Sequence, residues 1–130
     1  MRALLDTNVL VRHLTGDPPA QAKRATAFLR DSHELILTDL VLAEMVYVLE
    51  SFYEVSRTDI ARMSRSLLAF PSIETGDHEM LLRAIEIYEG LRLDFAEAYL
   101  SALAEMSDVK NVASFDRQID RVKSIERVEP

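Results

Sequence analysis

The sequence contains no cysteine among its 130 residues, which excludes both a disulfide framework and metal sites built from thiolates. It also contains no run approaching the roughly 20 apolar residues that a membrane span requires, and the N-terminal apolar stretch is far too short for a signal peptide. Repeats, low-complexity tracts and Gly/Ser linkers are missing as well. These absences favour a soluble, cytoplasmic protein with a single domain over residues 1–130.

Positive charge is in short supply, because 15 Lys and Arg face 22 Asp and Glu and the net charge is −7. A protein that binds nucleic acid through its overall charge is basic, so this balance argues against that class. An enzyme that gathers carboxylates around metal ions escapes the objection, since the bound cations reverse the local field. The overall charge therefore does not decide the function.

Short apolar runs alternate with helical patterns along the whole chain. The predicted strands cover residues 2–5, 35–37, the region of 73, 111–114 and 124–128. The predicted helices cover residues 9–14, 19–31, 39–52, 56–70, 77–90 and 94–106, with Gly90 as a C-cap. This alternation predicts an α/β fold, a three-layer α/β/α sandwich around a central, mostly parallel sheet of about five strands.

Five acidic residues occupy places where such a fold gathers its ligands, near the carboxyl ends of parallel strands. Asp6 and Asp116 directly follow predicted strands. Asp94 and Glu97 open a helix three residues apart, so their side chains face the same way. Glu44 lies inside the most apolar helix of the chain. If the strands are neighbours, these acids converge at one end of the sheet.

Carboxylates that converge in this way either stay partly protonated or bind divalent cations. Two charges about 4 Å apart repel by about 4 kcal/mol at an effective dielectric constant near 20. Oxygen ligands without Cys or His suit Mg²⁺ or Mn²⁺, and two such ions about 3.5–4 Å apart can promote an in-line phosphodiester displacement. No Ser–His–Asp arrangement and no glycine-rich phosphate loop in the sequence offers another chemistry.

Most of these acids also have a capping explanation, which their spacing leaves open. Asp6 could cap the helix that follows it, and Asp116 could start a turn or cap a short helix. Asp94 and Glu97 together match the D-x-x-E capping arrangement. The spacing alone therefore does not separate ligands from caps.

Glu44 has a different alternative, because it shares a helical face with Leu40, Tyr47 and Ser51 that is less apolar than the opposite face. A solvated surface glutamate would explain it nearly as well as a ligand. The three histidines lie in unrelated places and are predicted to be surface residues; they are His13, His33 and His78.

The order and local sequence of the acids resemble the four motifs of the PIN-domain family. The matching segments are, in chain order, residues 4–10, 38–44, 93–100 and 113–117. The resemblance runs from residue 4 to about residue 120. It implies a metal site whose ligands are Asp6, Glu44, Glu97 and Asp116, with Asp94 as an additional or alternative ligand.

Two positions depart from the family pattern. The family usually has Asp where this chain has Glu97, whose extra methylene shifts the carboxylate by more than an ångström, and Gln118 replaces a further acid found in many relatives. The resemblance also implies that Asn8 and Ser114 orient ligands or metal-bound water. The candidate contacts to RNA phosphates are Arg12, Arg92, Arg117 and Arg121.

The resemblance implies an endoribonuclease that depends on Mg²⁺ or Mn²⁺. The small single-domain form is similar to the VapC-like toxins of type II toxin–antitoxin pairs, which implies an RNA substrate, a homodimer and a VapB-like antitoxin partner. Alternatives on the same fold are a DNA nuclease, an RNA-processing nuclease and a catalytically weak binding module. A phosphate-accepting receiver domain does not fit, because Asp6 lacks an adjacent acid and Ser114 stands where a receiver has Lys.

Overall fold

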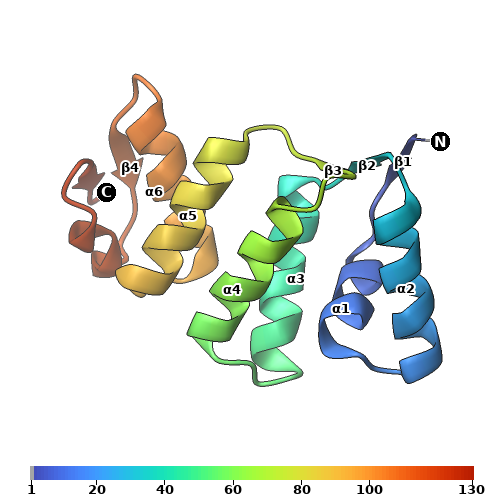
Figure 1. Ribbon diagram of the computed structural model, residues 1–130. Helices are drawn as coiled ribbons and strands as arrows, with labels where there is room; N and C mark the ends of the chain where they lie inside the picture. Colours follow the sequence, from blue (N-terminus) through green and yellow to red (C-terminus); the bar gives the residue numbers. More distant parts are fainter. Residues whose placement is uncertain (1) are drawn as a thin grey trace. The chain divides into compact units, whose positions relative to one another are not determined.

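The protein is described by a computed structural model that covers residues 2–130, and these residues form two compact units, 2–76 and 77–130 (Figure 1). The first unit contains a parallel sheet with the strand order β1-β2-β3. Its strands are β1 (Arg2–Leu4), β2 (Glu34–Ile36) and β3 (Ile73–Glu74). Its helices are α1 (Thr7–Thr15), α2 (Pro19–Asp31), α3 (Asp39–Ser51) and α4 (Arg57–Leu68).

Local signals in the sequence account for the helix boundaries of this unit. Pro19 begins α2, where its missing N–H removes no helical hydrogen bond. The hydroxyl of Thr38 accepts from the backbone N–H of Val41 at the start of α3. Gly16 ends α1 with φ 73, a left-handed conformation that glycine adopts without a steric penalty.

The second unit pairs two helices with a two-stranded parallel sheet. Its elements are α5 (His78–Gly90), α6 (Phe95–Met106), β4 (Asn111–Ala113), the 3₁₀ helix η1 (Arg117–Arg121) and β5 (Glu126–Val128). The helices α5 and α6 pack side by side (Figure 1), and the rings of Tyr88 and Phe95 meet edge to face at 5.9 Å. Arg83 on α5 binds Glu105 on α6 through two hydrogen bonds of 2.7 and 3.1 Å.

The predicted α/β class with parallel strands is confirmed, and the predicted number of strands is found in residues 2–130. Three of the strands are hydrogen-bonded in the first unit and two in the second. That residues 1–130 form a single domain stays a prediction.

The predicted C-cap of α5 was wrong. Gly90 is the last helical residue, Leu91 is the C-cap, and the left-handed residue is Arg92 with φ 61. The guanidinium of Arg121 donates to the carbonyls of Leu91 and Arg92, each at 3.1 Å, and these bonds hold the chain in this turn.

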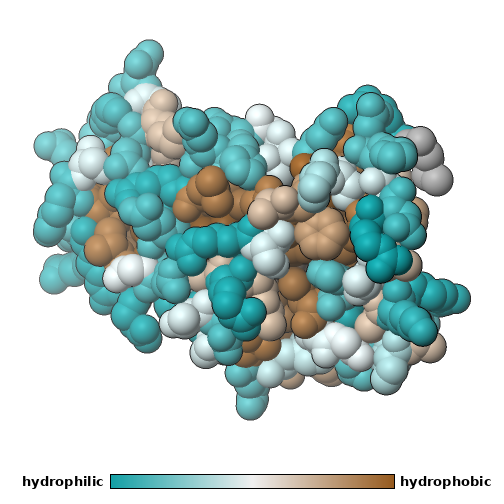
Figure 2. Space-filling model, viewed as in Figure 1, coloured by the Kyte–Doolittle hydropathy of each residue, from teal (hydrophilic) through white to brown (hydrophobic). Residues whose placement is uncertain are grey.

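Apolar side chains are not confined to the interior of the units. Figure 2 shows patches of hydrophobic residues between hydrophilic ones on the face that it presents. Among the large apolar residues, the most exposed are Phe52, Leu40 and Phe115. No helix formed by residues 2–130 is both long enough and apolar enough to cross a membrane.

Candidate metal centre

The start of α6 positions two of the predicted ligands. Asp94 is the N-cap residue, and its carbonyl accepts from the backbone N–H of Ala98 at 2.9 Å. Phe95 and Ala98 point into the core of the second unit, whereas Asp94 is exposed and Glu97 is half-buried. Within the part of the chain that the structure describes, the side chain of Asp94 makes no capping hydrogen bond. Its carboxylate is therefore not occupied by the helix that it begins.

The turn after β4 positions the third predicted ligand, Asp116. Ser114 directly follows the strand, and its hydroxyl accepts from the backbone N–H of Asp116 at 2.9 Å. One carboxylate oxygen of Asp116, Oδ1, accepts from the backbone N–H of Gln118 at 2.9 Å and so caps η1. These two bonds fix the half-buried Asp116 carboxylate relative to the strand end.

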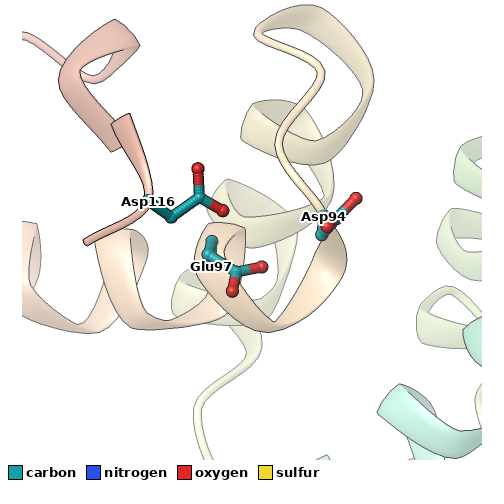
Figure 3. Close-up of side chains that lie close together, drawn as sticks. All are labelled: Asp94, Glu97 and Asp116. Carbon is teal, nitrogen blue, oxygen red and sulfur yellow. The ribbon is translucent and has the colours of Figure 1, made fainter. Parts of the chain in front are cut away.

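Asp94, Glu97 and Asp116 form one acidic cluster. Each contributes an oxygen atom, and the three atoms lie within 4.8 Å of one another. Figure 3 shows the side chain of Asp116 next to that of Glu97, with Asp94 at the start of the helix that carries Glu97. The longer side chain of Glu97 thus reaches the other two acids. An all-oxygen donor set of this kind fits Mg²⁺ or Mn²⁺.

Asp6 and Glu44, the other two predicted ligands, belong to the first unit. Asp6 is the exposed N-cap of α1, and its Oδ1 accepts from the backbone N–H of Thr7 at 2.9 Å. Asn8 is exposed in the first turn of that helix. Glu44 is exposed on α3, on the same face as the exposed Tyr47. Their membership of the ligand set stays a prediction.

The four arginines named as phosphate contacts differ in their surroundings. Arg12 is half-buried, and its Nε atom is buried without a hydrogen-bond partner among residues 2–130. Arg92 and Arg117 are exposed. Arg121 already donates to two main-chain carbonyls in the turn before Asp94. Contact with RNA phosphates stays a prediction for all four.

One histidine differs from the expectation of a surface residue. The Nδ1 atom of His13 lies 2.8 Å from the hydroxyl of Thr26, and its ring meets that of Phe70 edge to face at 5.5 Å. Partial burial lowers the pKa of His13. His33 and His78 are exposed, as predicted.

Arg127 is a residue of this region that the sequence pattern did not single out. It lies in β5, and the guanidinium donates to the main-chain carbonyl of Ser114 and to both carboxylate oxygens of Asp120. These hydrogen bonds hold the pKa of Asp120 below its usual value. Parallel pairing of β4 with β5 brings Arg127 to this place, and a single arginine in the sequence does not reveal such pairing.

The model of the PIN domain matches residues 3–125, and the chain therefore belongs to this family. The match agrees with the parallel strands joined by helices and with the order of the acids in the sequence. It is also similar to a VapC ribonuclease of Aquifex aeolicus, with 26% identity over 123 residues. That alignment covers 92% of this chain and 90% of the relative.

Proposed function

We propose that this protein is a single-domain endoribonuclease that depends on Mg²⁺ or Mn²⁺ and acts as the toxin of a toxin–antitoxin pair. The observation that carries the proposal is the acidic cluster of Asp94, Glu97 and Asp116. The sequence resemblance assigns these acids to the third and fourth PIN motifs. The similarity to a VapC ribonuclease supports RNA as the substrate and a VapB-like antitoxin as the partner. A cytoplasmic homodimer is part of the same proposal.

The side chains have distinct roles in this proposal. The three clustered acids hold the metal. Asp6 and Glu44 complete the ligand set, as the family resemblance implies. The metal, when bound, activates water and stabilises charge on the phosphodiester oxygens. Ser114 fixes the turn that carries Asp116 through the hydrogen bond to its N–H. Asn8 supports Asp6, and the named arginines contact RNA phosphates.

A cleavage assay tests the activity. Purified protein is expected to cut RNA in the presence of Mg²⁺ or Mn²⁺ and to stop when EDTA is added. Asp6→Asn and Asp116→Asn, prepared in the same way, are expected to be inactive and so control for a contaminating nuclease. Undiminished cleavage in EDTA by the wild type, with both variants silent, would exclude the metal-dependent mechanism.

Two further arms separate the alternatives. Cleavage of DNA in preference to RNA would favour a DNA nuclease, whereas metal binding without any cleavage would favour a binding module. Expression of the wild type without its partner is expected to arrest growth, while Asp116→Asn at the same protein level is tolerated. Normal growth with the active wild type would favour an RNA-processing nuclease over a toxin.

A further inference from the structure

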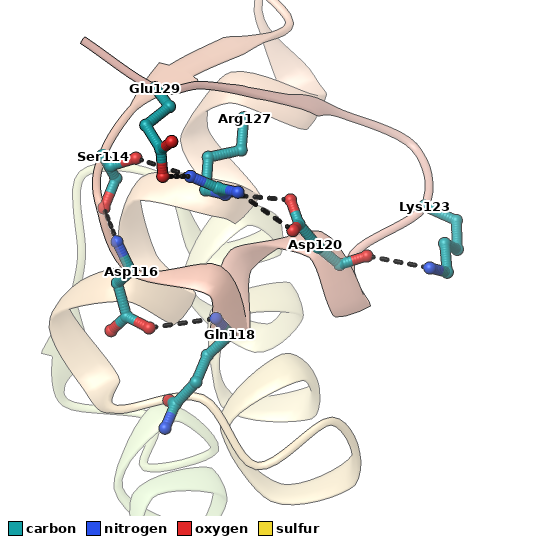
Figure 4. A network of polar contacts seen from close by, with 7 residues as sticks. All are labelled: Ser114, Asp116, Gln118, Asp120, Lys123, Arg127 and Glu129. Atoms are coloured by element: carbon teal, nitrogen blue, oxygen red, sulfur yellow. Dashed lines mark hydrogen bonds and ion pairs between the residues drawn. The ribbon is translucent and has the colours of Figure 1, made fainter.

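Asp116 sits in the middle of a short segment whose two ends are tied to one side chain. The segment runs from Ser114, directly after β4, to Asp120 in η1, and Figure 4 shows Arg127 between these ends. The Nη1 atom of Arg127 donates to the carbonyl of Ser114 at 3.0 Å. Its Nε and Nη2 atoms donate to the two carboxylate oxygens of Asp120 at 3.0 and 3.2 Å.

The contacts of Arg127 use the planar fork of the guanidinium. A fourth hydrogen bond, from Nη1 to Glu129 at 3.1 Å, adds a third acceptor group. The Arg127 side chain is only 12% exposed, although Asp120 and Glu129 are 53% and 51% exposed. A lysine carries one compact ammonium group and cannot donate to the Ser114 carbonyl and both Asp120 oxygens in this geometry. The arrangement is therefore specific to arginine.

We infer that Arg127 is a positioning residue for Asp116, and that it holds this carboxylate in place to share a metal ion with Asp94 and Glu97. The inference rests on the proposed function. Inside the segment, the carboxylate is already linked to the backbone N–H of Gln118, and its own N–H to the Ser114 hydroxyl. These local bonds shape the turn, and Arg127 fixes both ends of it against β5. Without the fork the turn gains conformational freedom, and metal binding has to restrict it again.

The test compares two arginines of the second unit. Arg127→Met removes the fork, and Arg127→Lys keeps only its charge. Arg83→Met is the matched control, because Arg83 also makes a bidentate bond to a carboxylate, that of Glu105, but is hydrogen-bonded to no residue of the segment 114–120 among the described contacts. The readout is the dissociation constant for Mn²⁺, measured by calorimetry well below the melting temperature of each variant.

Both Arg127 variants are expected to bind Mn²⁺ about 10- to 100-fold more weakly, the range seen when a group that orients a metal ligand is removed. Arg83→Met is expected to bind within twofold of the wild type, even though it melts at a lower temperature. In the metal-free protein, hydrogen exchange of the Gln118 amide is expected to be faster in Arg127→Met than in Arg83→Met. If Arg127→Met does not fold, Asp120→Asn, which weakens the same fork, takes its place with a smaller loss of affinity.

Wild-type affinity in a folded Arg127→Met protein would show that Arg127 only anchors the last strand. Full rescue by Arg127→Lys would also overturn the inference, since charge alone would then suffice. If the wild type itself binds no Mn²⁺ and cuts no RNA, the proposed function fails, and the inference fails with it. If the wild type binds and cuts while Arg127→Met binds equally well, the inference alone fails.

Discussion

The helices α5 and α6 begin with a similar sequence, but the side chains of their N-cap residues make different contacts. Each follows an aspartate at the N-cap and carries a glutamate in its first turn. The Asp77 carboxylate accepts from the backbone N–H of Met80 at 3.0 Å, as an N-cap normally does. The Asp94 carboxylate makes no such bond with the described residues and instead joins Glu97 and Asp116. The same residue thus serves the helix in one place and is left open to a ligand in the other.

The difference has an energetic meaning. A side-chain cap contributes about 0.5–2 kcal/mol, and α6 forgoes this contribution. The helix dipole favours a negative charge at both N-termini, so the dipole does not explain why only Asp94 lacks the bond. What distinguishes Asp94 is its acidic neighbours, Glu97 and Asp116. The two helix starts therefore form a matched pair within one unit, in which α5 supplies the control for each change made at α6.

The largest expected effect concerns the glutamates of the two first turns. Glu97→Gln should lower the RNA cleavage rate by about 1000-fold, since losing a metal ligand removes on the order of 4 kcal/mol of transition-state stabilisation. Glu79→Gln, in the first turn of α5, should leave the rate within about twofold, because Glu79 lies outside the acidic cluster. Single-turnover cleavage of one RNA measures both. Equal rates for the two variants would remove Glu97 from the ligand set and leave Asp94 as the third acid.

A smaller effect is expected on the stabilisation that Mg²⁺ provides. At 100 times its dissociation constant, a bound ligand stabilises the folded wild type by about 2.7 kcal/mol. Asp94→Ala should lose much of this gain because it weakens Mg²⁺ binding, whereas Asp77→Ala should keep it. Thermal melts with and without Mg²⁺ give the shift for each protein. A full Mg²⁺ shift in Asp94→Ala would mean that its carboxylate is not a ligand.

The smallest effect is expected on the free energy of unfolding without metal, where Asp77→Ala should be less stable than Asp94→Ala. Asp77→Ala should lower the free energy of unfolding by about 1 kcal/mol, the usual cost of losing a cap. Asp94→Ala should stay within about 0.5 kcal/mol of the wild type or become more stable, because no cap is lost and repulsion from the two acidic neighbours is relieved. Urea unfolding in EDTA measures both values. A loss at Asp94 as large as that at Asp77 would restore the capping explanation.

The sequence was sufficient to indicate the helices and strands and to name five acids, of which Asp94, Glu97 and Asp116 lie in one cluster. The periodicity of apolar residues predicts the helices and strands, and the carboxyl ends of the parallel strands predict where a ligand site lies. It could not show which aspartates cap, since capping depends on side-chain rotamers and backbone angles that a D-x-x-E spacing does not determine. In the structure, Asp6, Asp77 and Asp116 cap, and Asp94 does not.

Interactions across elements were beyond the sequence for a different reason. The parallel pairing of β4 with β5 brings Arg127 to the Ser114 carbonyl, and no local pattern encodes that pairing. The left-handed turn at Arg92 was missed in the same way, because a glycine two residues earlier offered the more obvious site. Its stabilising partner, Arg121, comes from η1. Residue types within a turn predict it well only when the hydrogen bonds that stabilise the turn come from those same residues.

The tie between Arg127 and the turn at Asp116 also bears on when the cluster forms during synthesis. A ribosome delivers the chain from its N-terminus, at roughly 5–20 residues per second. Asp94 and Glu97 emerge before Asp116, and the residue that fixes the Asp116 turn emerges later still. A nascent chain that ends between residues 116 and 127 therefore carries the three acids but not Arg127. If Arg127 positions Asp116 as we infer, that positioning begins only after residue 127 has been added to the chain.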